Sequence, residues 1–138
     1  ARRQWNLVDN KELDYHYLGD FDREMLKVIK SEKDFNKTPV QEIWHNDGDQ
    51  VLAYMRGDII FVFNFSPNRS YTDYGFIVPE GAYEVVLNTD SKDFGGNGLN
   101  DDSITHFTNY DNLYAQDGKG WLKLYWPARS ALVLRKKK

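Results

Sequence analysis

Histidine is the side chain best suited to act as a general base near neutral pH, and the sequence has three: His16, His45 and His106. A serine nucleophile of the hydrolase type would stand in a Gly-x-Ser-x-Gly turn, and the sequence contains no such motif. His16 falls in a segment with helical periodicity, whereas His45 and His106 fall in strand-like segments. The sequence therefore predicts no catalytic residue of the triad type in this chain.

Carboxylates are the next candidates for chemistry, because glycoside cleavage and calcium binding both use them. The chain has 21 acidic residues, and no spacing marks two of them as an acid and nucleophile pair. The segment "NTDSKDFGGNGLNDD" (88–102) gathers Asp90, Asp93, Asp101 and Asp102, but it lacks the alternating ligand spacing of an EF-hand. We interpret it as a polar loop and predict no metal site and no cofactor.

Aromatic side chains offer a third kind of chemistry, the stacking of pyranose rings. Four tryptophans and nine tyrosines are present, and amphipathic rings of this kind can pack against sugars. The segment "FNFSPNRSYTDYGF" (63–76) is the most conspicuous, because an apolar strand pattern breaks there at Ser66-Pro67 and a tyrosine-rich loop follows. Candidate site residues are Arg69, Tyr71, Asp73 and Tyr74, together with Trp121.

Two roles compete for these five residues. The first is docking to another domain or stabilising the turn, because Tyr hydroxyls and a carboxylate can satisfy backbone groups in a long loop. The second is contact with a sugar. Composition excludes other partners: the net charge of -3 argues against nucleic acid, and no apolar run approaches the ~20 residues of a membrane span. The chain has no cysteine, which excludes disulfides and thiolate chemistry and suits a reducing compartment.

The elements that must position these residues differ between the two parts of the chain. Residues 9–35 have helical periodicity and are expected to form two helices, the first ending at Gly19 and the second capped by Asp20. One apolar stripe of the second helix must be buried. Its members follow helical spacing: Phe21, Met25, Val28 and Ile29.

From Pro39 onward the pattern is typical of strands. The Asp47-Gly48 pair and the segment 79–81 read as turns. The run "IIFVFNF" (59–65) is apolar on both alternations and should be a central strand. About eight short strands separated by turns predict an antiparallel β-sandwich. The expected strands are 40–47, 51–58, 59–65, 71–78, 82–89, 103–110, 121–126 and 130–135.

Several motifs together carry a resemblance to a known family. The opening "ARRQWNLVDNKELDYHYLGDFDREM" is similar to the end of the catalytic barrel in 1,4-α-glucan branching enzymes of the α-amylase superfamily. The segments "FVFNFSPNRSYTDY", "YEVVLNTDSKDFGGNG" and "LKLYWPARSALVL" resemble successive parts of that family's C-terminal all-β domain. The chain departs from the family pattern at Ser66, where histidine is common, and at Gly75, where arginine is usual. It departs again at 97–99.

The resemblance implies a domain division and a function. Residues 1–38 would be the helical tail of an upstream (β/α)8 barrel, and residues 39–138 the C-terminal β-sandwich domain. The whole enzyme would transfer α-1,4-glucan segments to 6-hydroxyls in the cytoplasm, forming the α-1,6 branches of glycogen. Its retaining chemistry uses a carboxylate nucleophile and a carboxylic acid. These acids would lie upstream of residue 1, so this chain would be noncatalytic.

Two further expectations follow from the resemblance. The partners would be the upstream barrel of the same polypeptide and, as a further possibility, an α-glucan. Phe21, Met25 and Val28, separated from their barrel neighbours, would be partly exposed, or repacked on the sandwich or on a second copy. The alternative reading is a self-standing carbohydrate-binding module for α-glucans.

Overall fold

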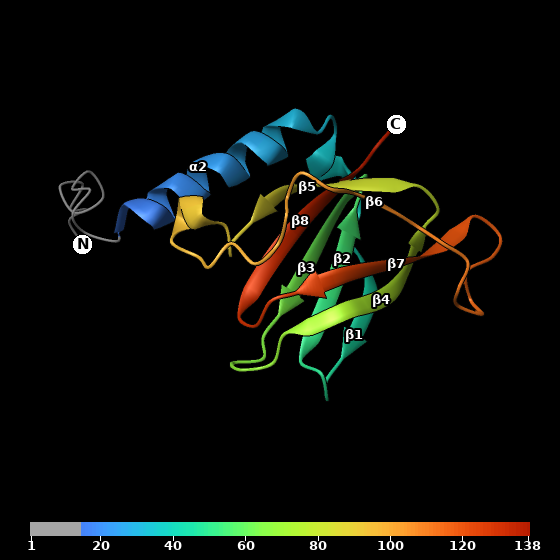
Figure 1. Cartoon of the computed structure of the whole chain (residues 1–138). Helices are drawn as coiled ribbons and strands as arrows, with labels where there is room; N and C mark the ends of the chain where they lie inside the picture. Colours follow the sequence, from blue (N-terminus) through green and yellow to red (C-terminus); the bar gives the residue numbers. More distant parts are fainter. Residues whose placement is uncertain (1–14) are drawn as a thin grey trace.

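The computed structural model describes residues 15–138, and its first element is helix α2 (Tyr15–Ser31), shown in blue in Figure 1. The expected start of the first helix at Asp9 or Asn10 lies outside the described residues. A short 3-10 turn, η1 (Phe35–Lys37), links the helix to the strands. Within residues 15–138 no helix is long and apolar enough to cross a membrane.

The predicted helix break at Gly19-Asp20 is wrong, because α2 runs through both residues without interruption. Glycine inside a helix costs only about 1 kcal/mol relative to alanine. The burial of the apolar stripe that follows is worth more than this. Asp20 does not begin a second helix; its carboxylate instead pairs with Arg23 at 3.1 Å, one turn further along α2.

All eight predicted strands are present, and the prediction of a mainly β sandwich is confirmed. Their bounds are β1 (Gln41–Asn46), β2 (Val51–Arg56), β3 (Ile59–Asn64), β4 (Tyr71–Pro79), β5 (Ala82–Asn88), β6 (Thr105–Phe107), β7 (Lys119–Trp126) and β8 (Ser130–Lys136). A second 3-10 turn, η2 (Lys92–Phe94), lies in the acidic loop after β5.

The strands form two antiparallel sheets that face each other. Six strands pair in the order β1-β2-β3-β8-β5-β6, and β4 pairs with β7 alone. Strand β3 lies in the interior of the larger sheet, as its continuous apolar sequence predicted. Figure 1 shows β4 and β7 crossing in front of the larger sheet.

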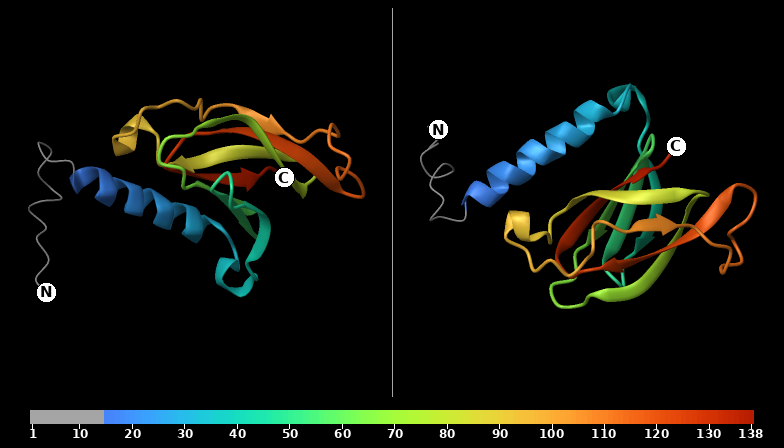
Figure 2. Two further views of the ribbon diagram at one scale, coloured as in Figure 1. Left: turned by 90° about the horizontal axis from the view of Figure 1, so that it is seen from below. Right: turned by 45° about the horizontal axis from the view of Figure 1, so that its top comes forward.

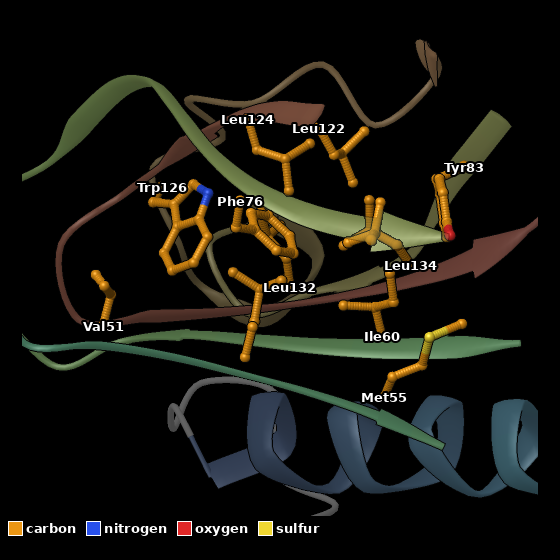
Figure 3. Packing of buried hydrophobic residues seen from close by; sticks show 13 residues of the cluster. Val51, Met55, Ile60, Phe76, Tyr83, Leu122, Leu124, Trp126, Leu132 and Leu134 are labelled. Carbon is orange, nitrogen blue, oxygen red and sulfur yellow. The ribbon is translucent and has the colours of Figure 1, made fainter. Parts of the chain in front are cut away.

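The main core fills the space between the two sheets. Figure 3 shows Phe76 and Trp126 from the smaller sheet directed toward Ile60 and Leu132 of the larger one. All four side chains are at most 2% exposed. Full burial of a side chain of this size contributes roughly 1.5–3 kcal/mol, so the interior between the sheets is the principal source of stability.

Helix α2 packs on the opposite face of the larger sheet, which gives the molecule a third layer (Figure 2). Val28 is 8% exposed and lies in a second cluster with Ile59, Leu87 and Val133, against which Phe21 and Met25 also pack. The guanidinium of Arg135 in β8 donates to the Glu32 carboxylate at 2.9 Å. The stripe therefore packs on the sandwich, with Val28 buried and with Phe21 and Met25 still partly exposed.

Candidate functional site

The loop between β3 and β4 is held by a buried asparagine at the end of β3. Asn64 is 2% exposed, and its Nδ2 donates to the carbonyl oxygens of Arg69 at 2.9 Å and Trp126 at 3.1 Å. Its Oδ1 accepts from the backbone N–H of Ser66 at 2.9 Å, and the Ser66 hydroxyl accepts from the N–H of Arg69 at 3.0 Å. Ser66 is fully buried. The loop is thus fixed by its own polar groups.

Three of the predicted site residues converge on the β1–β2 turn. Arg69 Nη2 donates to the carbonyl oxygen of Gly48 at 2.7 Å. The Tyr71 hydroxyl donates to the carbonyl oxygen of Asp49 at 2.7 Å, and the Tyr74 hydroxyl donates to Asp49 Oδ2 at 2.8 Å. Side chains of β4 and the loop before it therefore fasten a turn that is more than twenty residues away in the sequence.

An aromatic cluster surrounds the Tyr74 hydroxyl. Trp44 Nε1 donates to this oxygen at 3.1 Å, and the Tyr74 ring centroid lies 5.2 Å from that of Tyr71 and 4.9 Å from that of Trp126. Burial in this cluster raises the pKa of Tyr74 to about 12, and the neighbouring Asp49 carboxylate acts in the same direction. Tyr74 therefore stays protonated at physiological pH and acts as a hydrogen-bond donor.

Asp73 stands apart from this cluster. It has φ 51° and lies in an irregularity of the β4–β7 pairing between Tyr71 and Tyr74. Its side chain is exposed. The one extra residue of this bulge allows Tyr71 and Tyr74 to contact the same turn, which strict alternation along a strand would not permit for residues three apart.

Trp121 belongs to a different surface from the two tyrosines. It pairs with Ile77 across the smaller sheet, and its backbone exchanges hydrogen bonds of 2.8 and 2.9 Å with Asn109. The half-buried indole lies over Gly75, where an added Cβ would come 2.2 Å from the ring. Gly75 follows Tyr74 directly and so presents the opposite face of β4. The five candidates therefore do not form one site.

The acidic loop is organised around one buried carboxylate. Asp90 is 9% exposed, and its two oxygens accept the backbone N–H groups of Asn97 and Leu99, both at 3.0 Å. Asn88 Nδ2 donates to Asp102 Oδ1 at 3.0 Å. Within residues 15–138 no cluster of three His, Cys, Asp or Glu side chains is arranged to hold a metal ion. The geometry supports a self-bonded polar loop.

The histidines lie on three separate elements: α2 for His16, β1 for His45 and β6 for His106. His45 is exposed and pairs with Glu42 on its own strand. His106 is half-buried, and burial lowers its pKa. No two of them are brought together for acid–base chemistry in the part of the chain that the structure describes.

Sequence reasoning missed the residues that organise this region, namely Trp44, Asp49 and Asn64. Asn64 carries a recognisable signal, because an amide at the end of a buried strand must find partners for its donors and acceptor. Asp49 and Trp44 carry none, since their roles depend on strands that meet only in the folded molecule.

Comparison with known proteins relates the chain to enzymes of glucan metabolism. Residues 43–137 match the family described as alpha amylase, C-terminal all-beta domain. The chain is 38% identical over 135 residues to the 1,4-alpha-glucan-branching enzyme of Saccharomyces cerevisiae, covering 97% of this chain and 19% of that protein. The corresponding enzyme of Rhizophagus irregularis is 38% identical over 138 residues, again with 97% of this chain and 20% of that protein covered.

A plant relative gives the same result. The 1,4-alpha-glucan-branching enzyme, chloroplastic/amyloplastic, of Oryza sativa is 39% identical over 116 residues, covering 82% of this chain and 14% of that protein. The chain thus spans about a fifth or less of the length of these relatives. The family match covers both sheets of the sandwich, from β1 to β8. The chain belongs to the family of α-amylase C-terminal all-β domains.

Proposed function

We propose that this chain is the noncatalytic C-terminal domain of a 1,4-α-glucan branching enzyme and that it supports the catalytic part of the same polypeptide. One observation carries the proposal: nearly the whole chain aligns with branching enzymes at 38% identity, while those enzymes are about five times longer. The parent enzyme would cut an α-1,4 link and transfer the segment to a 6-hydroxyl, in the cytoplasm, to form α-1,6 branches.

A noncatalytic role agrees with the chemistry of the described residues. Retaining glycosyl transfer needs two carboxyl groups about 5–5.5 Å apart beside an open substrate site. The one buried carboxylate of the acidic loop, Asp90, accepts two backbone N–H groups, and the hydroxyls of Tyr71 and Tyr74 both donate to Asp49. The catalytic carboxylates would lie in the upstream barrel.

The proposed division places residues 1–38 at the end of that barrel and residues 39–138 in the sandwich. The packing of α2 supports a rigid coupling between the two, because Val28 is buried against β3, β5 and β8 and the partly buried Phe21 packs against the same cluster. The ion pair between Glu32 and Arg135 also joins the end of the helix to β8. In this arrangement the sandwich would hold the last barrel helix in position.

The role of the candidate site residues follows from the same argument. We assign Arg69, Tyr71 and Tyr74 to turn stabilisation, since each donates a hydrogen bond to residue 48 or 49. Asp73, whose side chain is exposed, and Trp121, which packs over Gly75, take no part in this contact. The self-standing glucan-binding module finds less support, because the two tyrosine hydroxyls that could bind sugar are committed internally.

The test compares the full parent polypeptide with the 138-residue chain alone. We expect the parent to convert amylose to a branched product, seen as a fall in iodine absorbance and as short chains after debranching, and the isolated chain to be inactive. Branching by the isolated chain would overturn the proposal, and so would a parent polypeptide without branching activity.

A second experiment separates the supporting role from the binding module. Affinity electrophoresis in gels containing glycogen should leave the mobility of the isolated chain unchanged. Retardation that is lost in Trp121→Ala or Tyr71→Ala, with Tyr114→Ala as an exposed aromatic control, would instead favour the module.

A further inference from the structure

Two apolar grooves share Thr89 in their linings, and together they are called the trough. The first is lined by Tyr17, Leu18 and Phe21 of α2 and by Phe94 of η2. The second is lined by Phe63, Phe65 and Ala131 at the ends of β3 and β8. Thr89 lies in both. Helix α2 therefore forms one wall of the trough, and the uncovered end of the larger sheet forms its floor.

Large apolar side chains in this trough are open to solvent. Leu18 is 64% exposed and Phe65 is 60% exposed. The Phe65 ring stacks on that of Phe63 at a centroid distance of 5.7 Å with planes 8° apart, so the floor presents a preformed flat aromatic surface. Contiguous exposed apolar surface of this kind marks interaction sites in soluble proteins.

We propose that this trough is the surface on which the preceding domain of the same polypeptide docks; the inference rests on the proposed function. About four-fifths of each full-length fungal relative lies outside the part that this chain matches. The wall of the trough is α2, which the proposed division makes the last helix of that preceding domain, so the rest of the domain would be attached directly beside the trough. A covalently attached domain has a high effective concentration at a surface beside its attachment point, so this occupant is favoured over a free partner.

The lining also defines the chemistry of the partner surface. Apart from Arg129, the side chains that line the two grooves are uncharged, and most are apolar. The docking surface should therefore project apolar side chains into the trough and place a hydrogen-bond acceptor, a carboxylate or a carbonyl, near Arg129. Buried apolar anchors surrounded by a polar rim are the usual anatomy of such interfaces.

The test introduces a charge into the trough in two contexts, the full parent polypeptide and the 138-residue chain. Leu18→Glu should lower the midpoint temperature of the first unfolding transition of the full polypeptide by about 2–4 °C. In the isolated chain the midpoint should change by less than about 1 °C, because Leu18 is solvent-exposed there. The matched control is Leu113→Glu, because Leu113 is 79% exposed and lies outside the trough. It should be neutral in both contexts.

Carbene footprinting gives a second readout that does not depend on stability. Labelling of Leu18 and Phe65 should be strong in the isolated chain and largely lost in the full polypeptide, while Leu113 should be labelled equally in both. Equal labelling of Leu18 in the two proteins, or a neutral Leu18→Glu in the full polypeptide, would overturn the inference. Protection already present in the isolated chain would assign the trough to a second copy or to the chain's own first residues, and would also overturn it.

The outcome is separable from that of the proposed function. A full polypeptide that branches amylose but tolerates Leu18→Glu refutes only the docking surface. A polypeptide that lacks branching activity refutes the proposed function, whatever the footprint shows.

Discussion

The hydroxyl of Tyr74 allows a sharp test of how β4 is fastened to the β1–β2 turn. In Tyr74→Phe the ring remains, but the bond to Asp49 Oδ2 at 2.8 Å and the bond from Trp44 Nε1 at 3.1 Å are both lost. A neutral hydrogen bond contributes about 1 kcal/mol and one to a charged group about 1.5–3 kcal/mol. Because the site is partly exposed and water can replace part of the loss, we expect a destabilisation of about 2 kcal/mol.

For a chain of 138 residues this loss corresponds to a fall in Tm of about 6–8 °C. Urea unfolding followed by fluorescence should show the same difference in the free energy of unfolding, with an unchanged m-value. Tyr114→Phe is the matched control, since Tyr114 is 68% exposed, and it should leave both quantities unchanged.

A double-mutant cycle with Asp49→Ala isolates the pair. That substitution removes the carboxylate but keeps the backbone carbonyl that accepts from Tyr71. The two single changes should show a coupling energy of about 1 kcal/mol. A Tyr74→Phe variant as stable as the unaltered chain, or a coupling near zero, would refute the view that this hydroxyl fastens the turn.

The pH dependence gives an independent check with a definite sign. The folded-state pKa of Tyr74 is raised to about 12 from an ordinary value of 10.0. The stabilisation linked to the neutral phenol is therefore complete below pH 10 and is lost as the pH rises from 10 toward 12. Tyr74→Phe should show a smaller loss of stability over this window, measured by urea midpoints at each pH.

Other substitutions test the remaining contacts. Gly75→Ala should displace the Trp121 indole, since an added Cβ would lie 2.2 Å from it, and tryptophan fluorescence should shift to the red; an unchanged spectrum would contradict the packing. Asp90→Ala should cost about 3 kcal/mol in urea unfolding, because two backbone N–H groups of the acidic loop lose their acceptor. Val28→Ala should lower the free energy of unfolding by about 1–2 kcal/mol and increase amide exchange in α2. A variant with unchanged stability and unchanged exchange would contradict the packing of α2 on the sheet.

Most of the fold could be predicted because it depends on local pattern. β-branched and aromatic residues between turn signals predict each strand, and the prediction that the run 59–65 lies in the interior of a sheet is confirmed. The failure at Gly19 has a physical reason. A glycine ends a helix only when the residues after it gain no packing energy from staying helical. Here Phe21 and Val28 pack on the sheet from helical positions, and this favours continuation of the helix.

The candidate site could be predicted only in part, for a different reason. The loop at 66–74 was recognised from its break in pattern, and Arg69, Tyr71 and Tyr74 do meet at one place. Trp121 could not be separated from them by sequence, because only the alternation of β4 and its pairing with β7 place it beside Gly75 on the opposite face.

The sequence by itself determined the class of fold, the number of strands, the absence of thiol chemistry and the family, because these depend on composition, periodicity and motif order along the chain. Only the tertiary structure decided which polar groups are already satisfied and which apolar surfaces stay open. The hydroxyl of Tyr74 donates to Asp49 because β4 meets the β1–β2 turn. The stripe of α2 packs on the sheet while Leu18 remains exposed because the helix lies on one face of that sheet. Both outcomes depend on contacts between segments that are distant in the sequence. Such contacts exist only once the sheets have formed.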